Sequence, residues 1–122
     1  MPEKRTYKPL TVYETKKEVL EILNSGNREK LLILPLSIGE NFPDWKFAQE
    51  ICLKLAKSED EEIRANAILG LAYLARTHGK LDRHLVEPII IKELKSHSKF
   101  KGRIEDAIDD INVDLGWNFK VL

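Results

Sequence analysis

The chain contains almost no cysteine, no long apolar run and no excess of charge of either sign. Its single cysteine, Cys52, rules out an internal disulfide, and its apolar neighbours indicate a small buried side chain in a reducing compartment. No apolar run approaches the roughly 18 residues that a membrane-spanning helix needs. Residues 1–9 are basic and polar, unlike the apolar centre of a secretory signal. We therefore expect a cytoplasmic protein that does not enter a membrane.

The charges balance, with 20 basic and 20 acidic residues among 122 and no formal net charge. A nucleic-acid-binding protein normally shows a basic excess or stripe, so the balance argues against bulk binding of DNA or RNA. The length fits one domain with its own hydrophobic core. We assign residues 1–122 to this domain, with a poorly ordered or loosely packed lead-in at 1–14 and an apolar C-terminal tail at 116–122.

The first part of the chain is predicted to form helices with short connections. Thr15 and Glu18 make a capping box, in which each side chain accepts a hydrogen bond from the other residue's backbone amide. Gly26 is expected to stop this helix, because glycine enters the left-handed conformation freely. A second helix is predicted over 28–38. Pro35 should kink or end it, since proline lacks the amide donor and clashes one turn back.

The third and fourth helices carry the clearest patterns. Asp44 is expected to cap a helix whose apolar residues recur at helical spacing, namely Ala48, Ile51, Cys52, Leu55 and Ala56. In the next helix, over 61–78, only Asn66 is strongly polar between Ala65 and Ala75. A helix that is apolar on nearly all sides lies at the centre of a fold, and its small residues let neighbouring helices approach closely.

Two further helices complete the pattern. The fifth is expected to start at Asp82 or at Glu87, because Pro88 suits a first helical turn. Its three consecutive isoleucines would also fit a strand, but no second strand is available to pair with it. The sixth helix should end at Gly116, and its apolar residues fall at i, i+3, i+4 and i+7: Ile104, Ala107, Ile108 and Ile111.

The fourth and sixth helices match when the chain is shifted by 40 residues. The shift places Ala67 on Ala107, Ile68 on Ile108 and Leu71 on Ile111. A period near 40 with two helices per unit is typical of HEAT-type and armadillo-type solenoids. The predicted fold is therefore all-α, an α-α superhelix of about six helices in HEAT-like antiparallel pairs.

The stretch 60–75 (DEEIRANAILGLAYLA) resembles the second helix of a HEAT repeat, with an acidic start, an Ile-Arg pair and a leucine-rich face. The longer run 45–110 resembles short bacterial HEAT-like proteins, some of which are encoded beside toxins and act as their immunity partners. The residues that carry the likeness are Asp44, Trp45, Ala48, Gln49, Cys52, Leu53, Ile63, Arg64, Ala67, Leu71, 74–79, Leu81, Asp82, Glu105, Asp106, Ala107, Asp110 and Ile111. The resemblance implies a protein-binding module, in its sharpest form an immunity protein or inhibitor that binds a basic toxin domain directly. The first 40 residues depart from the HEAT pattern, so the first unit is expected to be degenerate.

An acidic cluster follows a basic segment near the end of the chain. The basic residues are Lys92, Lys95, Lys99, Lys101 and Arg103, and the acidic ones are Glu105, Asp106, Asp109, Asp110 and Asp114. Like charges four residues apart destabilise a helix by about 0.2–0.5 kcal/mol per pair, so something should offset them. Two explanations are open. In the first, Arg64 and Arg76 of the preceding unit form ion pairs with these acids, like the ladders of Arg–Asp pairs between HEAT repeats. In the second, part of the acidic face binds a basic partner. Asp114 is the acid that such a ladder explains least.

No set of residues indicates catalysis, a cofactor or a metal. The histidines His78, His84 and His97 lack the i, i+4 spacing, and one cysteine cannot complete a zinc set. His78, near a helix C-terminus, is explained by the helix dipole and by a structural contact between units. The serines fall at predicted caps and turns. We expect no enzyme activity, no catalytic residue and no cofactor.

Two other functions are alternatives to a protein-binding module. HEAT-type DNA glycosylases share the predicted architecture, although this chain is short and neutral. A purely structural subunit would use the apolar tail, which contains Trp117 and Phe119, for self-association. The tail would otherwise cover the exposed end of the last unit. The expected partner is another protein, and the expected state is a monomer or a weak homodimer.

Overall fold

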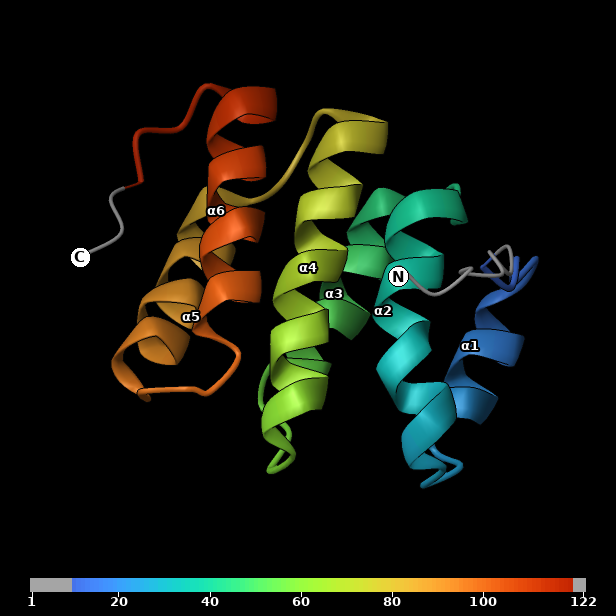
Figure 1. Cartoon of the computed structure of the whole chain (residues 1–122). Helices are drawn as coiled ribbons and strands as arrows, with labels where there is room; N and C mark the ends of the chain where they lie inside the picture. The colour runs from blue at the N-terminus through green and yellow to red at the C-terminus, as the bar shows by residue number, and fades with distance from the viewer. Residues whose placement is uncertain (1–9, 120–122) are drawn as a thin grey trace, which may run out of the picture.

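The computed structural model describes residues 10–119, which form six α-helices joined by short loops (Figure 1). The helices are α1 Lys16–Leu23, α2 Arg28–Asn41, α3 Trp45–Leu55, α4 Glu61–His78, α5 Arg83–Lys95 and α6 Lys101–Leu115. No strand occurs among the described residues. The prediction of an all-α fold with about six helices is confirmed.

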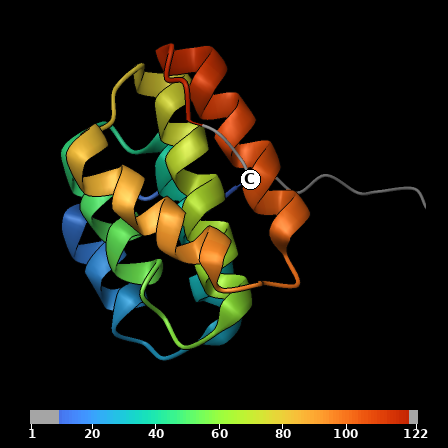
Figure 2. The ribbon, with the colours of Figure 1, turned by 90° about the vertical axis from the view of Figure 1, so that its left-hand side faces the viewer.

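The helices stack in two layers. Figure 1 shows α2, α4 and α6 side by side and running in the same direction, with α3 behind α4 and α5 behind α6. Each helix of this front layer follows an antiparallel partner along the chain. Figure 2 looks onto one end of the stack, which α5 and α6 form together. This is the α-α arrangement that the sequence predicts.

Local capping signals start the helices near the predicted positions. The capping box is present, with the Thr15 hydroxyl accepting from the Glu18 amide at 3.2 Å and the Glu18 carboxylate accepting from the Thr15 amide at 3.1 Å. Asp44 and Asp60 cap α3 and α4 by accepting from amides two or three residues later. Of the two predicted starts of α5, the earlier one, at Asp82, is observed.

The second helix differs from the prediction, because α2 does not end at Pro35 or at Ile38 but runs on to Asn41. Pro35 is buried against α4, and its carbonyl group lies beside Gly70, where an added Cβ would come within 2.6 Å. Proline removes only one amide donor from the helix interior. The close packing of α2 on α4 offsets that loss, which the sequence of α2 alone could not reveal.

The core lies between the layers and centres on α4, which packs against both α2 and α6. Ile68, Leu71 and Leu74 of this helix are fully buried, and so are the small residues beside them. Burial of one large aliphatic side chain contributes about 1.5–3 kcal/mol to folding. The predicted central position of the 61–78 helix is confirmed. Within the described part of the chain, no helix has the length and apolarity needed to cross a membrane.

Candidate protein-binding surface

The acidic cluster of the sequence analysis lies on the outer side of α6. Asp106, Asp109, Asp110 and Asp114 are exposed there, and we refer to these four residues as the acidic α6 face. Glu105 is half-buried and stands apart from them. The helix places the four carboxylates outward because its apolar stripe is turned to the core: Ile104, Ala107, Ile108 and Ile111.

Val113 lies between Asp110 and Asp114 along this acidic surface and is 82% exposed. No other large apolar side chain of residues 10–119 is exposed to this extent. Single exposed apolar residues are common in soluble proteins and mean little alone. Here, the valine is flanked along the helix by Asp109, Asp110 and Asp114, so an apolar centre lies within an anionic surround.

The four carboxylates have no ion-pair partner within residues 10–119. Glu105, in contrast, lies 4.0 Å from the Lys101 Nζ. Asp106 and Asp110 are a like-charge pair at i, i+4, and Asp114 lies in the last turn, where the helix dipole disfavours negative charge. Within residues 10–119, these four acids therefore add no ion-pair stabilisation to the fold.

The predicted bridges from Arg64 and Arg76 to the acids of α6 are not what the structure shows. Arg64 donates to the Glu93 carboxylate of α5 at 2.8 Å and also to the carbonyl oxygens of Ser58 and Glu59. Arg76 is exposed, and its guanidinium lies 4.8 Å from the centre of the Tyr73 ring. Arg64 lies in the first turn of α4, beside α5, and this position directs its side chain to α5 and not to α6.

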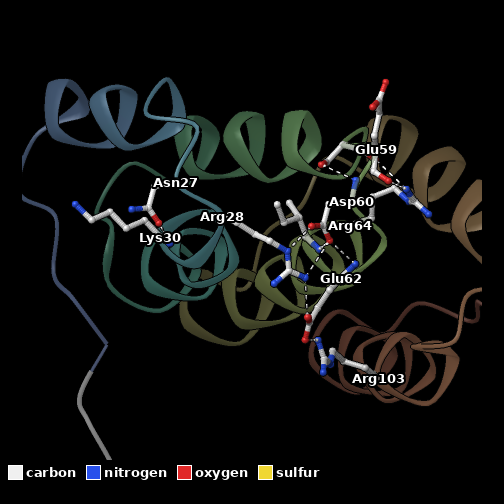
Figure 3. Close-up of polar contacts among 10 residues, drawn as sticks. Asn27, Arg28, Lys30, Glu59, Asp60, Glu62, Arg64 and Arg103 are labelled. Carbon is white, nitrogen blue, oxygen red and sulfur yellow. Dashed lines mark hydrogen bonds and ion pairs between the residues drawn. The ribbon is translucent and has the colours of Figure 1, made fainter.

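An ion-pair network does join the three front helices, but through other residues. The Arg28 guanidinium at the start of α2 lies 2.6 Å from Asp60 and 3.1 Å from Glu62 at the start of α4 (Figure 3). Glu62 also pairs with Arg103 of α6 at 3.5 Å. The hydrogen bond from Arg28, together with the backbone amides that Asp60 caps, lowers the pKa of the Asp60 carboxyl, and the same pairing raises the pKa of Arg28.

Asn66 extends the network one turn further along α4. This nearly buried side chain accepts from Arg103 at 2.6 Å and donates to the Leu32 carbonyl oxygen at 2.8 Å. In the sequence, Asn66 is an isolated polar residue in an apolar helix, and its role in this network could not be recognised from that pattern. The feature that could have indicated it is the presence of Arg28 and Arg103 near the start of the two neighbouring helices, opposite the acidic first turn of α4.

His78 makes a contact at the other end of the stack. Its Nε2 lies 2.9 Å from the carbonyl oxygen of Phe42, which caps the C-terminus of α2. The contact joins α4 to α2. The other two histidines, His84 and His97, are exposed.

The C-terminal tail is described as far as Phe119, and residues 120–122 of the predicted tail lie outside the described part. Trp117 and Phe119 pack against the core cluster. The Arg83 guanidinium lies 5.1 Å from the centre of the Trp117 ring, and Asn112 exchanges two hydrogen bonds with the Phe119 backbone, at 2.8 and 3.0 Å. These contacts attach the described part of the tail to both α5 and α6.

The described residues include no group of three or more histidine, cysteine, aspartate or glutamate side chains able to hold a metal ion. Burial raises the pKa of the Cys52 thiol to about 12. The thiol is therefore protonated at neutral pH and unreactive as a nucleophile. Its burial agrees with the structural role assigned to it from the sequence.

A scan against protein-family models finds none that matches the chain, and a search of curated proteins finds no relative. A solved chain with a similar fold comes from the crystal structure of a CDI complex from Cupriavidus taiwanensis LMG 19424. The likeness covers 90% of this chain and 97% of that chain, with a TM-score of 0.75 and 24% sequence identity. At this identity the likeness shows a shared fold: the described helices follow the same architecture as a chain solved in a CDI complex.

Proposed function

We propose that this chain is a protein-binding module of the immunity type, which neutralises a basic toxin domain by binding it directly. The proposal rests mainly on the acidic α6 face: its four carboxylates have no ion-pair partner in the described chain, and three of them flank Val113. Unpaired surface charge of one sign speeds the association of an oppositely charged partner, and an apolar centre adds contact area.

Two further considerations support the proposal. CDI is a toxin–immunity system, and the neighbour of similar fold was solved in a CDI complex. The resemblance of the sequence to HEAT-like immunity proteins suggests the same kind of function. We also propose that the chain acts by binding and not by catalysis, since the described residues present no nucleophile activated by a base.

The first experiment identifies the partner and tests neutralisation. The tagged chain is purified from its native cell, the co-purifying protein is identified, and its gene is expressed with and without this chain. We expect a stoichiometric protein with a basic surface whose expression arrests growth only when this chain is absent. A partner that is harmless when expressed alone would contradict the immunity role.

The second experiment tests the surface on the purified pair. Asp109→Lys combined with Asp110→Lys should weaken binding by roughly tenfold or more, mainly through slower association, and should reduce its sensitivity to salt. Glu50→Lys, which changes an exposed acid on α3, serves as the matched control and should bind as the unmodified chain does. Equal loss in both variants, or in neither, would mean that the acidic α6 face is not the binding surface.

A further inference from the structure

A cleft of about 510 Å³ lies between α5 and the C-terminal tail, at the end of the stack seen in Figure 2. Ile91 and Leu94 of α5 and Phe119 of the tail supply its apolar lining. The hydrogen bonds between Asn112 and the Phe119 backbone attach the tail wall to α6, so the cleft is built by specific contacts. Its volume falls in the range of sites that take a side chain or small ligand.

The rim of this cleft is basic. Arg83 lies on the rim but is already engaged, by Glu87 at 2.6 Å and by the Asn118 amide oxygen at 3.1 Å. Lys95 also lines the cleft, whereas Lys92, one turn before it on the same helix, lines a separate pocket with Lys57 and Ser58. Both lysines are exposed and have no ion-pair partner in the part of the chain that the structure describes. Within the described residues, Lys95 therefore places an unpaired positive charge on the rim of the apolar cleft, and Lys92 adds a second on the adjoining surface of α5.

The neighbouring helix presents the complementary surface. Val113 projects from α6 between carboxylates that have no ion-pair partner in residues 10–119, Asp109 and Asp110 before it and Asp114 after it. One surface is an apolar cleft with a cationic rim, and the other is an apolar knob with an anionic surround. The elements that carry the two surfaces, α5, α6 and the tail, form the same end of the stack (Figure 2). Each surface is the kind of partner that the other requires.

We propose that two copies of this chain associate end to end, with Val113 of each copy entering the cleft of the other. The carboxylates of Asp109 and Asp110 then face Lys92 and Lys95 of the second copy. Since cleft and knob share one end of the molecule, a two-fold axis satisfies both contacts at once, as in an isologous dimer. The formal net charge of zero leaves no long-range repulsion between copies.

This association is independent of the proposed function and is tested on the purified full chain without any partner. Sedimentation velocity over a concentration series should show a monomer–dimer equilibrium that shifts toward monomer as salt is raised, because the contacts are ionic at their edges. Val113→Asp should raise the dimer dissociation constant by roughly tenfold to a hundredfold, through lost burial of the valine.

Charge reversal gives the sharpest test. One variant carries Lys92→Glu and Lys95→Glu, and the other carries Asp109→Lys and Asp110→Lys. Each variant alone should be monomeric, because both of its end surfaces then bear the same sign of charge. An equimolar mixture should regain dimers, since the two variants are complementary at both contacts. The matched control, Lys54→Glu at an exposed position of α3, should dimerise like the unmodified chain.

All these positions are exposed, so unchanged thermal midpoints are expected and are measured for every variant. A chain that stays monomeric up to millimolar concentration would overturn the proposal. A mixture of the two charge-reversed variants that stays monomeric would overturn it as well, as would dimers that Val113→Asp does not weaken. None of these results bears on whether a foreign protein binds, whereas a confirmed dimer predicts that such a partner at the acidic α6 face competes with the second copy.

Discussion

At the scale of single residues, two glycines set how closely α2 and α4 pack. A Cβ on Gly70 would lie 2.6 Å from the Pro35 carbonyl oxygen and 2.9 Å from the Pro35 Cβ. Gly39 lies on the α2 side of the same contact between α2 and α4, and an added Cβ there would collide with the Gly70 carbonyl oxygen. Backbone atoms cannot turn aside as a flexible side chain can, so a larger residue at either position forces the helices apart.

Gly70→Ala is therefore expected to destabilise the fold by about 1–3 kcal/mol, in spite of the better helix propensity of alanine. Gly102→Ala is the matched control, because Gly102 is also helical and an added Cβ there meets nothing within 4 Å. This second change should stabilise the fold by about 0.5–1 kcal/mol. Urea unfolding of both variants measures the difference. A stable Gly70→Ala variant would mean that the close crossing is wrong.

Asp60 makes stability depend on pH. Its pKa is lowered in the folded state, chiefly by the hydrogen bond from Arg28, so the folded protein holds the proton less tightly than the unfolded chain. The resulting stabilisation is present above the unfolded pKa, near 3.8, and is lost as the pH falls through the folded pKa below it.

Asp60→Asn keeps a capping side chain but removes the charge that Arg28 meets. The free energy of unfolding should therefore be lower than that of the unmodified chain at pH 7, and the two values should converge as the pH falls below 3.8. Asp106→Asn, at an exposed acid without an ion-pair partner among the described residues, is the control and should differ little at either pH. If the free energies of unfolding of Asp60→Asn and of the unmodified chain differed by the same amount at every pH, the role assigned to this carboxylate would be contradicted.

At the scale of helices, α5 is attached to α4 by a pair that is largely withdrawn from water. Glu93 is 4% exposed, and its carboxylate is held by Arg64 at 2.8 Å. Gln49 of α3 adds a second connection, because its amide group exchanges two hydrogen bonds with Asp82 at the start of α5. A buried carboxylate without its cation would be strongly destabilising.

Arg64→Ala should accordingly destabilise the fold by about 3–5 kcal/mol, because it leaves Glu93 buried and uncompensated. Arg76→Ala, at the other end of the same helix, removes an exposed cation–π contact and should cost no more than about 1 kcal/mol. Thermal and urea unfolding compare the two. Similar losses would mean that burial of the Arg64–Glu93 pair contributes little.

At the scale of the whole molecule, α4 is enclosed on several sides, whereas α1 lies at one end of the stack (Figure 1). Of the eight residues of α1 only Val19 is buried, but ten of the eighteen in α4 are. Local opening is easiest where few apolar contacts must be broken. The stability of the stack should thus decrease from its middle toward its N-terminal end.

Hydrogen exchange tests this order. The backbone amides of residues 68–75 should exchange last, with the free energy of global unfolding, and those of α1 should exchange earlier through local opening. Early exchange in the middle of α4 would contradict the layered packing on which both proposals depend.

Much of the fold could be predicted because it depends on short-range patterns. The stripe in α3 and the Thr15 capping box act within a few residues, so they can be recognised before any packing is known. The prediction that the second helix ends near Pro35 was wrong because α2 is stabilised there by its contact with Gly70, a residue far along the chain. The ladder from Arg64 was wrong for a related reason, since the residue that an arginine reaches depends on how two helices are aligned.

The sequence by itself determined that this protein is a set of six helices and that the acids of α6 lie opposite an apolar stripe. A period of 3.6 residues is a property of one segment and needs no partner. Only the tertiary structure decided that Arg64 pairs with Glu93, that Arg28 and Arg103 meet at Glu62, and that a cleft forms between α5 and the C-terminal tail. These features join residues about 30 to 40 positions apart or more, and their distances are set by the rigid packing of whole helices.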